Sequence, residues 1–244
     1  MAKNKKWILA AVAVLAVVLC CWAAWSKWAS TTRIGLVNFQ NYQTASLVKS
    51  NEDNFIEYEE IPLDRLDRLG RYDLVLGFGM GLKITEEQRA QILAAADEGT
   101  PIYIYAATNP ENDICSLDSL TKAGISAYIG NGNKRNYRNM ARYVRQHIDA
   151  KRLFVTPAEE AVESASDVLY HLDEDLSFKT VADYEKYLRE QGIYREKAPK
   201  IAIVGGLNDP FSGNRANIDS LIVSLQNAGM NVYPVSSYRQ RLTF

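Results

Sequence analysis

The chain begins with a long uncharged run and continues as short apolar stretches that alternate with amphipathic ones. Residues 7–26 carry no charged side chain, and about 20 apolar residues are enough to span a bilayer as a helix. Farther along, apolar runs at residues 34–39, 72–78 and 101–106 predict buried strands, and the alternating run at residues 54–59 predicts a weaker one. Because helices or turns separate these strands, we expect parallel pairing with right-handed crossovers.

Further segments complete a first α/β domain over residues 33–158. Thr85 is followed three residues later by Gln88, a capping box that predicts the start of a helix. Residues 126–129 are predicted as one more strand. This alternation predicts a flavodoxin-like or Rossmann-like parallel sheet. The acidic residues 159–177 that follow are expected to be a linker without strands.

A strand–helix–strand unit is predicted near the end of the chain. Residues 201–204 predict a buried strand, apolar positions recur at helical spacing over residues 218–225, and residues 232–235 begin another strand. Gly229 lies where a helix C-cap is expected. We expect residues 178–244 to be the start of a second α/β domain that is cut short.

The loop after the first strand of this unit supplies the candidate ligand-binding residues. Open α/β sheets bind ligands at the carboxyl ends of their strands, where the N-termini of the following helices also favour anions. The candidates have small or polar side chains and are Gly206, Asn208, Ser212, Gly213 and Asn214.

The uncharged run has the flanks of a membrane anchor. Three lysines precede it, and Lys27 and Arg33 follow it, so the positive-inside rule predicts a cytoplasmic N-terminus and a periplasmic body. Tryptophans at both ends fit the interfacial belts of a membrane helix. We therefore expect residues 1–32 to form a short cytoplasmic tail and a single-pass helix in the inner membrane, with lipid as its partner. A cleaved signal peptide stays open as the alternative, although the run is long for one.

Composition adds two exclusions. The chain has 28 basic and 29 acidic residues and a formal charge of −1, so nothing attracts it in bulk to nucleic acid, and no nucleic-acid partner is expected. Cys115 is the only cysteine outside the uncharged run, which excludes an intramolecular disulfide scaffold in the body.

Part of the C-terminal unit resembles a known family. The residues that carry the resemblance are Ser212-Gly213-Asn214, Asn217-Ile218-Asp219, Leu221-Ile222, Gly229-Met230-Asn231-Val232 and Pro234-Val235, preceded by Tyr184, Tyr187-Leu188 and Gly192-Ile193-Tyr194. They look like the N-terminal region of the large subunit of cobaltochelatase, whose family includes the magnesium chelatase H subunit. Family members carry an arginine-serine-histidine type of loop after the first strand, whereas this chain has Leu207 to Phe211 there.

The resemblance implies a complete protein that inserts or removes a metal ion (cobalt, magnesium or haem iron) in a tetrapyrrole, with further chelatase domains or partner subunits. Because ATP is absent from the periplasm, haem is the tetrapyrrole expected of an anchored member there. This chain alone is expected to do no chemistry, and no bound cofactor is assigned to it. The alternative is a membrane-tethered α/β ligand-binding or scaffold module without an enzymatic partner.

Four arginines form a second candidate surface. Arg135, Arg138, Arg142 and Arg145 recur at spacings of three, four and three, which places them on one face of a helix predicted over residues 133–149. Such a face suits an anionic partner, including lipid head groups or the carboxylates of a tetrapyrrole. A solvated charged face is the alternative.

Two other features suggest chemistry but receive a plainer interpretation. Neither His147 nor His171 has a second histidine or a cysteine at metal-ligand spacing. For His171, a surface histidine beside acidic residues is predicted, with an axial-ligand role as the less favoured alternative. The glycines within residues 77–81 follow a strand as in a dinucleotide loop, but the fingerprint is incomplete and a tight loop is expected. No metal site is predicted.

Overall fold

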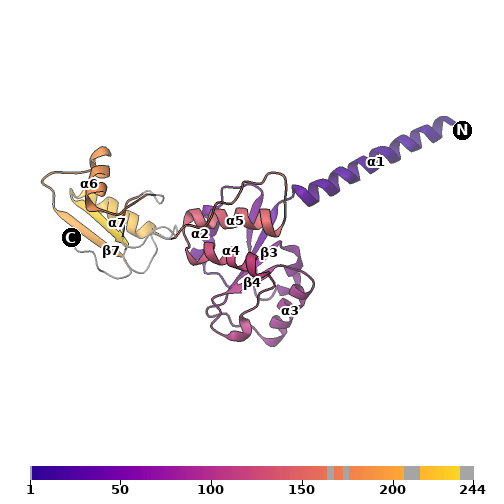
Figure 1. Ribbon diagram of the computed structural model, residues 1–244, viewed down its shortest axis with the longest axis horizontal. Helices are drawn as coiled ribbons and strands as arrows, with labels where there is room; N and C mark the ends of the chain where they lie inside the picture. Colours follow the sequence, from indigo (N-terminus) through magenta and orange to yellow (C-terminus); the bar gives the residue numbers. More distant parts are fainter. Residues whose placement is uncertain (1, 164–167, 173–175, 206–214, 237–244) are drawn as a thin grey trace. The chain divides into compact units, whose positions relative to one another are not determined.

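The chain forms two compact units, each built around a four-stranded sheet (Figure 1). The computed structural model describes residues 2–163, 168–172, 176–205 and 215–236, with only the backbone for residues 2–11. The strands are β1 (Thr32–Val37), β2 (Ile56–Glu60), β3 (Leu74–Phe78), β4 (Ile102–Tyr105), β5 (Val168–Tyr170), β6 (Ser177–Phe178), β7 (Lys200–Gly205) and β8 (Asn231–Ser236).

Helices connect these strands. The α-helices are α1 (Ala2–Trp28), α2 (Asn41–Ser50), α3 (Glu86–Asp97), α4 (Ser119–Gly130), α5 (Lys134–Tyr143), α6 (Val181–Glu190) and α7 (Ala216–Asn227). The short elements are the 3-10 helices η1 (Leu66–Arg71) and η2 (Pro110–Asn112) and the π-helix η3 (Val144–Ile148).

The units interleave along the sequence. The first comprises Met1–Phe39, Asp53–Lys122 and Ala141–Ala158, and the second comprises Gln40–Glu52, Ala123–Met140 and Glu159–Phe244. The division of the chain into domains at residues 33–158 and 178–244 stays a prediction.

The first sheet is parallel throughout, in the order β2-β1-β3-β4, as the sequence predicts. Its strands are continuous apolar runs because both faces are covered, which is the usual state of a parallel sheet. Leu74, Val75 and Leu76 illustrate this, since successive side chains point to opposite faces and each is at most 2% exposed.

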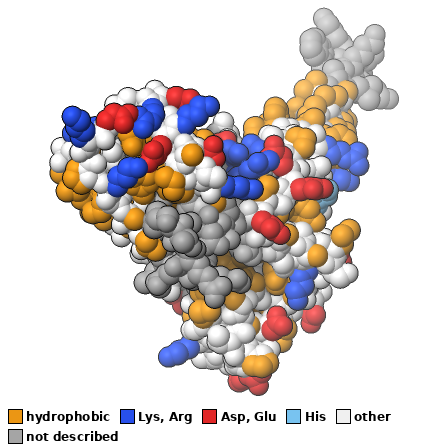
Figure 2. All heavy atoms as spheres, turned by 60° about the vertical axis from the view of Figure 1, so that its left-hand side comes forward, with side chains coloured by type: hydrophobic (Ala, Val, Ile, Leu, Met, Phe, Trp, Pro, Cys, Tyr) orange, Lys and Arg blue, Asp and Glu red, His pale blue; other side chains and the backbone are white. Residues whose placement is uncertain are grey.

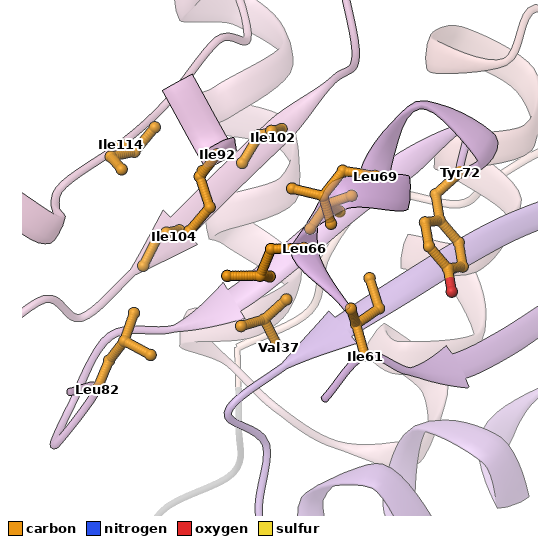
Figure 3. Close-up of a cluster of buried hydrophobic side chains, with 11 residues drawn as sticks. Val37, Ile61, Leu66, Leu69, Tyr72, Leu82, Ile92, Ile102, Ile104 and Ile114 are labelled. Atoms are coloured by element: carbon orange, nitrogen blue, oxygen red, sulfur yellow. The ribbon is translucent and has the colours of Figure 1, made fainter. Parts of the chain in front are cut away.

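One face of the first sheet packs against η1 and α3 (Figure 3). The buried side chains of this cluster are Val37, Ile61, Leu66, Leu69, Tyr72, Val75, Leu82, Ile92, Ile102, Ile104 and Ile114. The start of α3 is fixed by the predicted capping box: the Thr85 hydroxyl accepts from the backbone N–H of Gln88, and the Gln88 side chain accepts from the backbone N–H of Thr85.

One strand prediction is wrong. Residues 126–129 belong to α4, in which Ile125 and Tyr128 are buried three residues apart. That spacing is the period of a helix, and a run of four residues is too short to distinguish it from the period of a strand.

The second sheet is mixed, in the order β6-β5-β8-β7. The predicted strand–helix–strand unit is confirmed, since β7 and β8 are parallel neighbours joined through α7, and Gly229 has the positive φ of 87° expected after a helix. The expectation that residues 159–177 lack strand structure is wrong at β5, which pairs antiparallel with β8 and β6.

The two helices of this sheet cover opposite faces. Val168 and Tyr170 pack with Ile222 of α7, whereas Leu169 packs with Tyr184 and Leu188 of α6.

Residues 2–28 form one continuous helix, α1. Among the residues whose side chains the structure describes, no helix is long and apolar enough to cross a membrane. The predicted span at residues 7–26 begins before that part of the chain.

Candidate functional site

The carboxyl edge of the first sheet is the first candidate site. In the order β2-β1-β3-β4, the chain passes from β1 to β2 on one side and then crosses to β3 on the other side of β1. Open α/β sheets bind ligands at such a switch point in strand order. Asn38 follows β1 with a φ of 60°, a left-handed conformation that asparagine tolerates. Its Nδ2 donates to the carbonyl oxygens of Phe78 at 2.7 Å and Met80 at 3.3 Å, which fixes the residue after β1 against the end of β3.

Three half-buried aromatic side chains gather at this edge: Phe39, Phe78 and Tyr105, here called the aromatic rim. The ring centroids of Phe78 and Tyr105 are 5.5 Å apart, and that of Phe39 lies 6.3 Å and 6.0 Å from them. The rings are inclined by 54° to 61°, an arrangement that aromatic pairs favour. Part of the apolar surface of these rings stays exposed.

The backbone beside the aromatic rim is tightly constrained. A Cβ atom on Gly79 would lie 2.6 Å from the Cα of Ala107, so only glycine fits there. Ala106 has a φ of 54°, and strain of this kind concentrates at functional sites. The tight loop at residues 77–81 is predicted from its glycines, and Phe78 is not recognised as a candidate from the sequence. A signal for it exists, because Phe39, Phe78 and Tyr105 lie at or just beyond the ends of three parallel strands.

His171 is the centre of a second candidate site, in the second unit. Its side chain is 3% exposed, so the prediction of a surface histidine is wrong. The hydroxyl of Tyr187 lies 3.4 Å from Nδ1, and the amide nitrogen of Gln226 lies 2.9 Å from Nε2. Because Tyr187 belongs to α6 and Gln226 to α7, the imidazole joins the helices of both faces. His171 directly follows β5, a strand that the sequence did not predict, and it is buried at that position.

Arg215 completes this cluster and is 2% exposed. It donates to the carbonyl oxygen of His171, pairs with Asp219 at 2.7 Å, and lies 5.1 Å from the ring centre of Tyr170. Burial, and after it the charge of Arg215, lowers the pKa of His171. The lowered pKa favours the neutral imidazole, which contacts both helices through its two ring nitrogens.

The predicted ligand loop, with Gly206, Asn208, Ser212, Gly213 and Asn214, lies outside the described residues. Within the described ranges, no group of three or more histidine, cysteine, aspartate or glutamate side chains is placed to hold a metal ion.

The predicted arginine face is divided between different environments. Arg135 pairs with Glu159 at 2.9 Å and Arg138 with Glu52 at 2.8 Å, all in the second unit and partly exposed. Both cations are thus paired with carboxylates of the chain, and their role toward an anionic partner stays a prediction. In the first unit, Arg142 is half-buried, and its Nε has no hydrogen-bond partner in the part of the chain that the structure describes.

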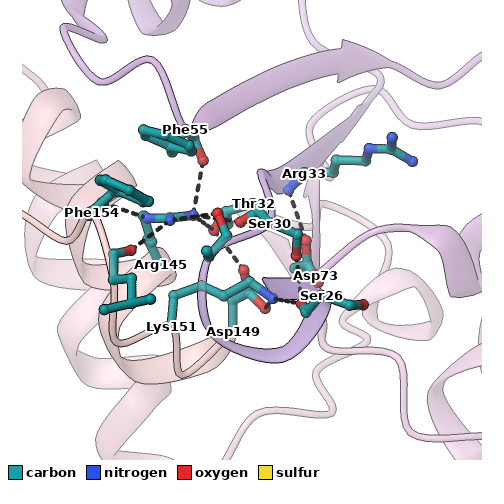
Figure 4. Close-up of polar contacts among 12 residues, drawn as sticks. Ser26, Ser30, Thr32, Arg33, Phe55, Asp73, Arg145, Asp149, Lys151 and Phe154 are labelled. Atoms are coloured by element: carbon teal, nitrogen blue, oxygen red, sulfur yellow. Dashed lines mark hydrogen bonds and ion pairs between the residues drawn. The ribbon is translucent and has the colours of Figure 1, made fainter. Parts of the chain in front are cut away.

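Arg145 does not belong to that face, because it is completely buried. The α-helical turn ends at Tyr143 and a π-helix follows, which changes the number of residues per turn and rotates Arg145 inward. Its guanidinium donates to backbone carbonyl oxygens and to Thr32 (Figure 4). Burial lowers its pKa, while nearby carboxylates oppose that shift, and a guanidinium stays charged in proteins.

Comparisons with known proteins relate this geometry to a family. Residues 126–243 match the family described as CobN/Magnesium Chelatase. No curated protein matches the chain. Among solved structures, the catalytic subunit of cobaltochelatase from Mycobacterium tuberculosis has a similar fold, with a TM-score of 0.56 and 16% sequence identity over 87% of this chain. The chain spans 17% of the length of that subunit.

Proposed function

Because residues 126–243 match the CobN/magnesium chelatase family, we propose that the chain is a membrane-anchored part of a protein that inserts or removes a metal ion in a tetrapyrrole. The family match carries the chelatase part of this proposal, and the similar fold of a cobaltochelatase subunit supports that part. The metal is cobalt, magnesium or haem iron, and haem is the substrate we favour for a protein outside the cytoplasm.

The chain's own part in this activity is to bind and orient the macrocycle. The aromatic rim supplies ring surfaces for stacking. Arg135 and Arg138 are paired with exposed or half-exposed glutamates, and surface pairs of this kind contribute little stability. In the second unit, an anionic partner can therefore replace either glutamate at small cost, separately from the aromatic rim of the first unit. The reacting groups are expected in further chelatase domains.

A haem titration tests this role. The Soret band should report weak binding to the 244-residue chain, and tighter binding when further chelatase domains complete the cleft, because good sites enclose most of their ligand. Phe78→Leu should weaken binding roughly three- to tenfold, the value of one aromatic pair. Tyr42→Leu, at an exposed aromatic of α2, is the matched control and should change nothing. Failure of the longer protein to bind would favour the scaffold alternative.

The membrane anchor is proposed from the uncharged residues 7–26 and their charged flanks. Protease added to spheroplasts should digest the body and leave an N-terminal stub in the inner membrane. A body protected from protease, or a mature chain that begins near Trp28, would contradict the anchor.

A further inference from the structure

The loop at residues 151–154 lies against the C-terminal end of α1, although more than a hundred residues separate them in sequence. The backbone N–H groups of Arg152 and Leu153 donate to the carbonyl oxygen of Trp28 at 3.1 Å and 2.9 Å. The ammonium of Lys151 donates to the carbonyl oxygen of Ser26 at 3.1 Å. These donors satisfy carbonyl groups that the end of a helix leaves free.

Arg145 fixes the loop and the helix end to each other (Figure 4). Its guanidinium donates to the carbonyl oxygen of Ser30 at 2.9 Å, just beyond α1, and to those of Leu153 and Phe154 at 3.0 Å. Because one planar, buried group holds both segments, the loop keeps a constant position relative to α1. The body of the first unit is therefore tied to the C-terminal end of the helix through this loop.

The side chains at this junction are apolar but face outward. Leu153 is 49% exposed, Phe154 54% and Trp25 52%, and the rings of Trp25 and Phe154 lie 6.1 Å apart. Phe154 has a φ of 55°, a conformation that a bulky residue adopts only when its surroundings impose it. The Phe154 ring stacks on that of Phe55, with centroids 4.6 Å apart, and about half of the residue stays exposed at the base of an apolar helix.

Two cations at the junction are exposed, Lys27 on α1 and Arg152 in the loop. The carboxylate of Asp149 is occupied by Lys151 and Thr32, and that of the partly buried Asp73 accepts from the backbone N–H of Arg33. Figure 2 shows hydrophobic side chains along the helix, and both Lys or Arg and Asp or Glu side chains near its base. Aromatic rings with cations on an apolar helix are the composition of a segment that lies in the head-group layer of a membrane.

We propose that Trp25, Trp28, Leu153 and Phe154, with Lys27 and Arg152, form a membrane collar that lies in the head-group layer of an anionic bilayer. The proposal rests on the membrane anchoring by α1 proposed above and adds a second contact made by the folded body. The first unit is then held against the bilayer surface in one orientation.

Fluorescent labels at single cysteines test the collar. Cys20, Cys21 and Cys115 are replaced by alanine, and Phe154→Cys, Leu15→Cys and Leu93→Cys are each labelled and placed in vesicles containing anionic lipid. The label at 154 should be quenched by a lipid that carries its quencher at head-group depth, and protected from aqueous iodide. The label at 93, an exposed apolar position on α3, should show the reverse.

The three positions separate the two proposals. If the label at 15 is protected from iodide but the label at 154 is as accessible as that at 93, the collar is refuted and the anchor survives. If the label at 15 is also accessible, both are refuted. In the background of Arg152→Glu, the label at 154 should lose part of its protection in anionic vesicles and none in neutral ones. If Arg152→Glu leaves the protection of the label at 154 unchanged in both anionic and neutral vesicles, the charge of Arg152 has no role in the collar.

Discussion

Arg145 can be replaced by methionine, which is apolar and flexible enough to fill much of the same space but donates no hydrogen bond. The carbonyl oxygens that now accept from the guanidinium are those of Ala29, Ser30, Phe55, Leu153 and Phe154. The oxygen of Phe55 also accepts from the backbone N–H of Thr32 at 2.9 Å, so it keeps a donor in the variant. The contact with Ala29 is long, at 3.4 Å, and its loss matters least.

The remaining three carbonyl groups determine how much the free energy of unfolding falls. A buried polar group left without its partner costs about 1–3 kcal/mol, so the upper limit for Ser30, Leu153 and Phe154 is about 9 kcal/mol. Leu153 and Phe154 are half-exposed, and water can replace part of what they lose. We therefore expect Arg145→Met to lower the free energy of unfolding by about 3–5 kcal/mol, as when one partner of a buried charged contact is removed. Arg145→Lys should lose less, because an ammonium keeps the charge without the planar fork.

Urea unfolding in mild detergent, followed by circular dichroism, measures this loss through the midpoint and slope. Arg68→Met is the matched control, since that side chain is 67% exposed and its ion pair with Asp67 is 3.6 Å long; its effect should stay within about 0.5 kcal/mol. Hydrogen exchange at the amides of Arg152 and Leu153 should accelerate in Arg145→Met. A loss below about 1 kcal/mol, the net value of a single ordinary hydrogen bond, would refute the assignment of Arg145 as the buried link.

Two further predictions concern the candidate sites. Folding lowers the pKa of His171 below its ordinary 6.5, so the unfolded chain binds the proton first as the pH falls. The free energy of unfolding should therefore decrease as the pH drops below about 6.5 and level off below the folded pKa. His171→Gln should remove this pH dependence in unfolding titrations, whereas His147→Gln, at the exposed histidine, should keep it. Gly79→Ala should destabilise the chain by about 1–3 kcal/mol in thermal melts because the new Cβ meets the backbone of Ala107, whereas Gly130→Ala meets nothing within 4 Å; equal effects would contradict the close approach at β3.

Local patterns in the sequence were sufficient wherever neighbouring residues decide the structure. The start of α3 was predicted because Thr85 and Gln88 satisfy each other's backbone, and the end of α7 because Gly229 supplies a left-handed residue. β5 was not predicted because its three residues, in an acidic stretch, are too few to show a strand periodicity. Its partner β8 also lies some sixty residues later in the sequence.

The candidate sites depend on distant residues to a greater extent. Phe39, Phe78 and Tyr105 meet only after the sheet order places β1, β3 and β4 side by side, which spacing along the chain does not reveal. Arg145 continued a regular arginine series in the sequence, and a π-helical turn removed it from that series. The predicted loop at residues 206–214 is not among the described residues, so its role stays a prediction.

The pairing of β5 with β8 also sets the order in which the second sheet can assemble during synthesis. β5 is made about 60 residues before its partner, and β7 lies between them in sequence. At ordinary translation speeds this interval lasts roughly 3 to 13 s, during which Val168, Leu169 and Tyr170 have no neighbouring strand on the side that β8 later occupies. An early antiparallel strand that waits for a late one is a site for premature pairing or chaperone binding, and a ribosome pause just before β8 would prolong that exposure.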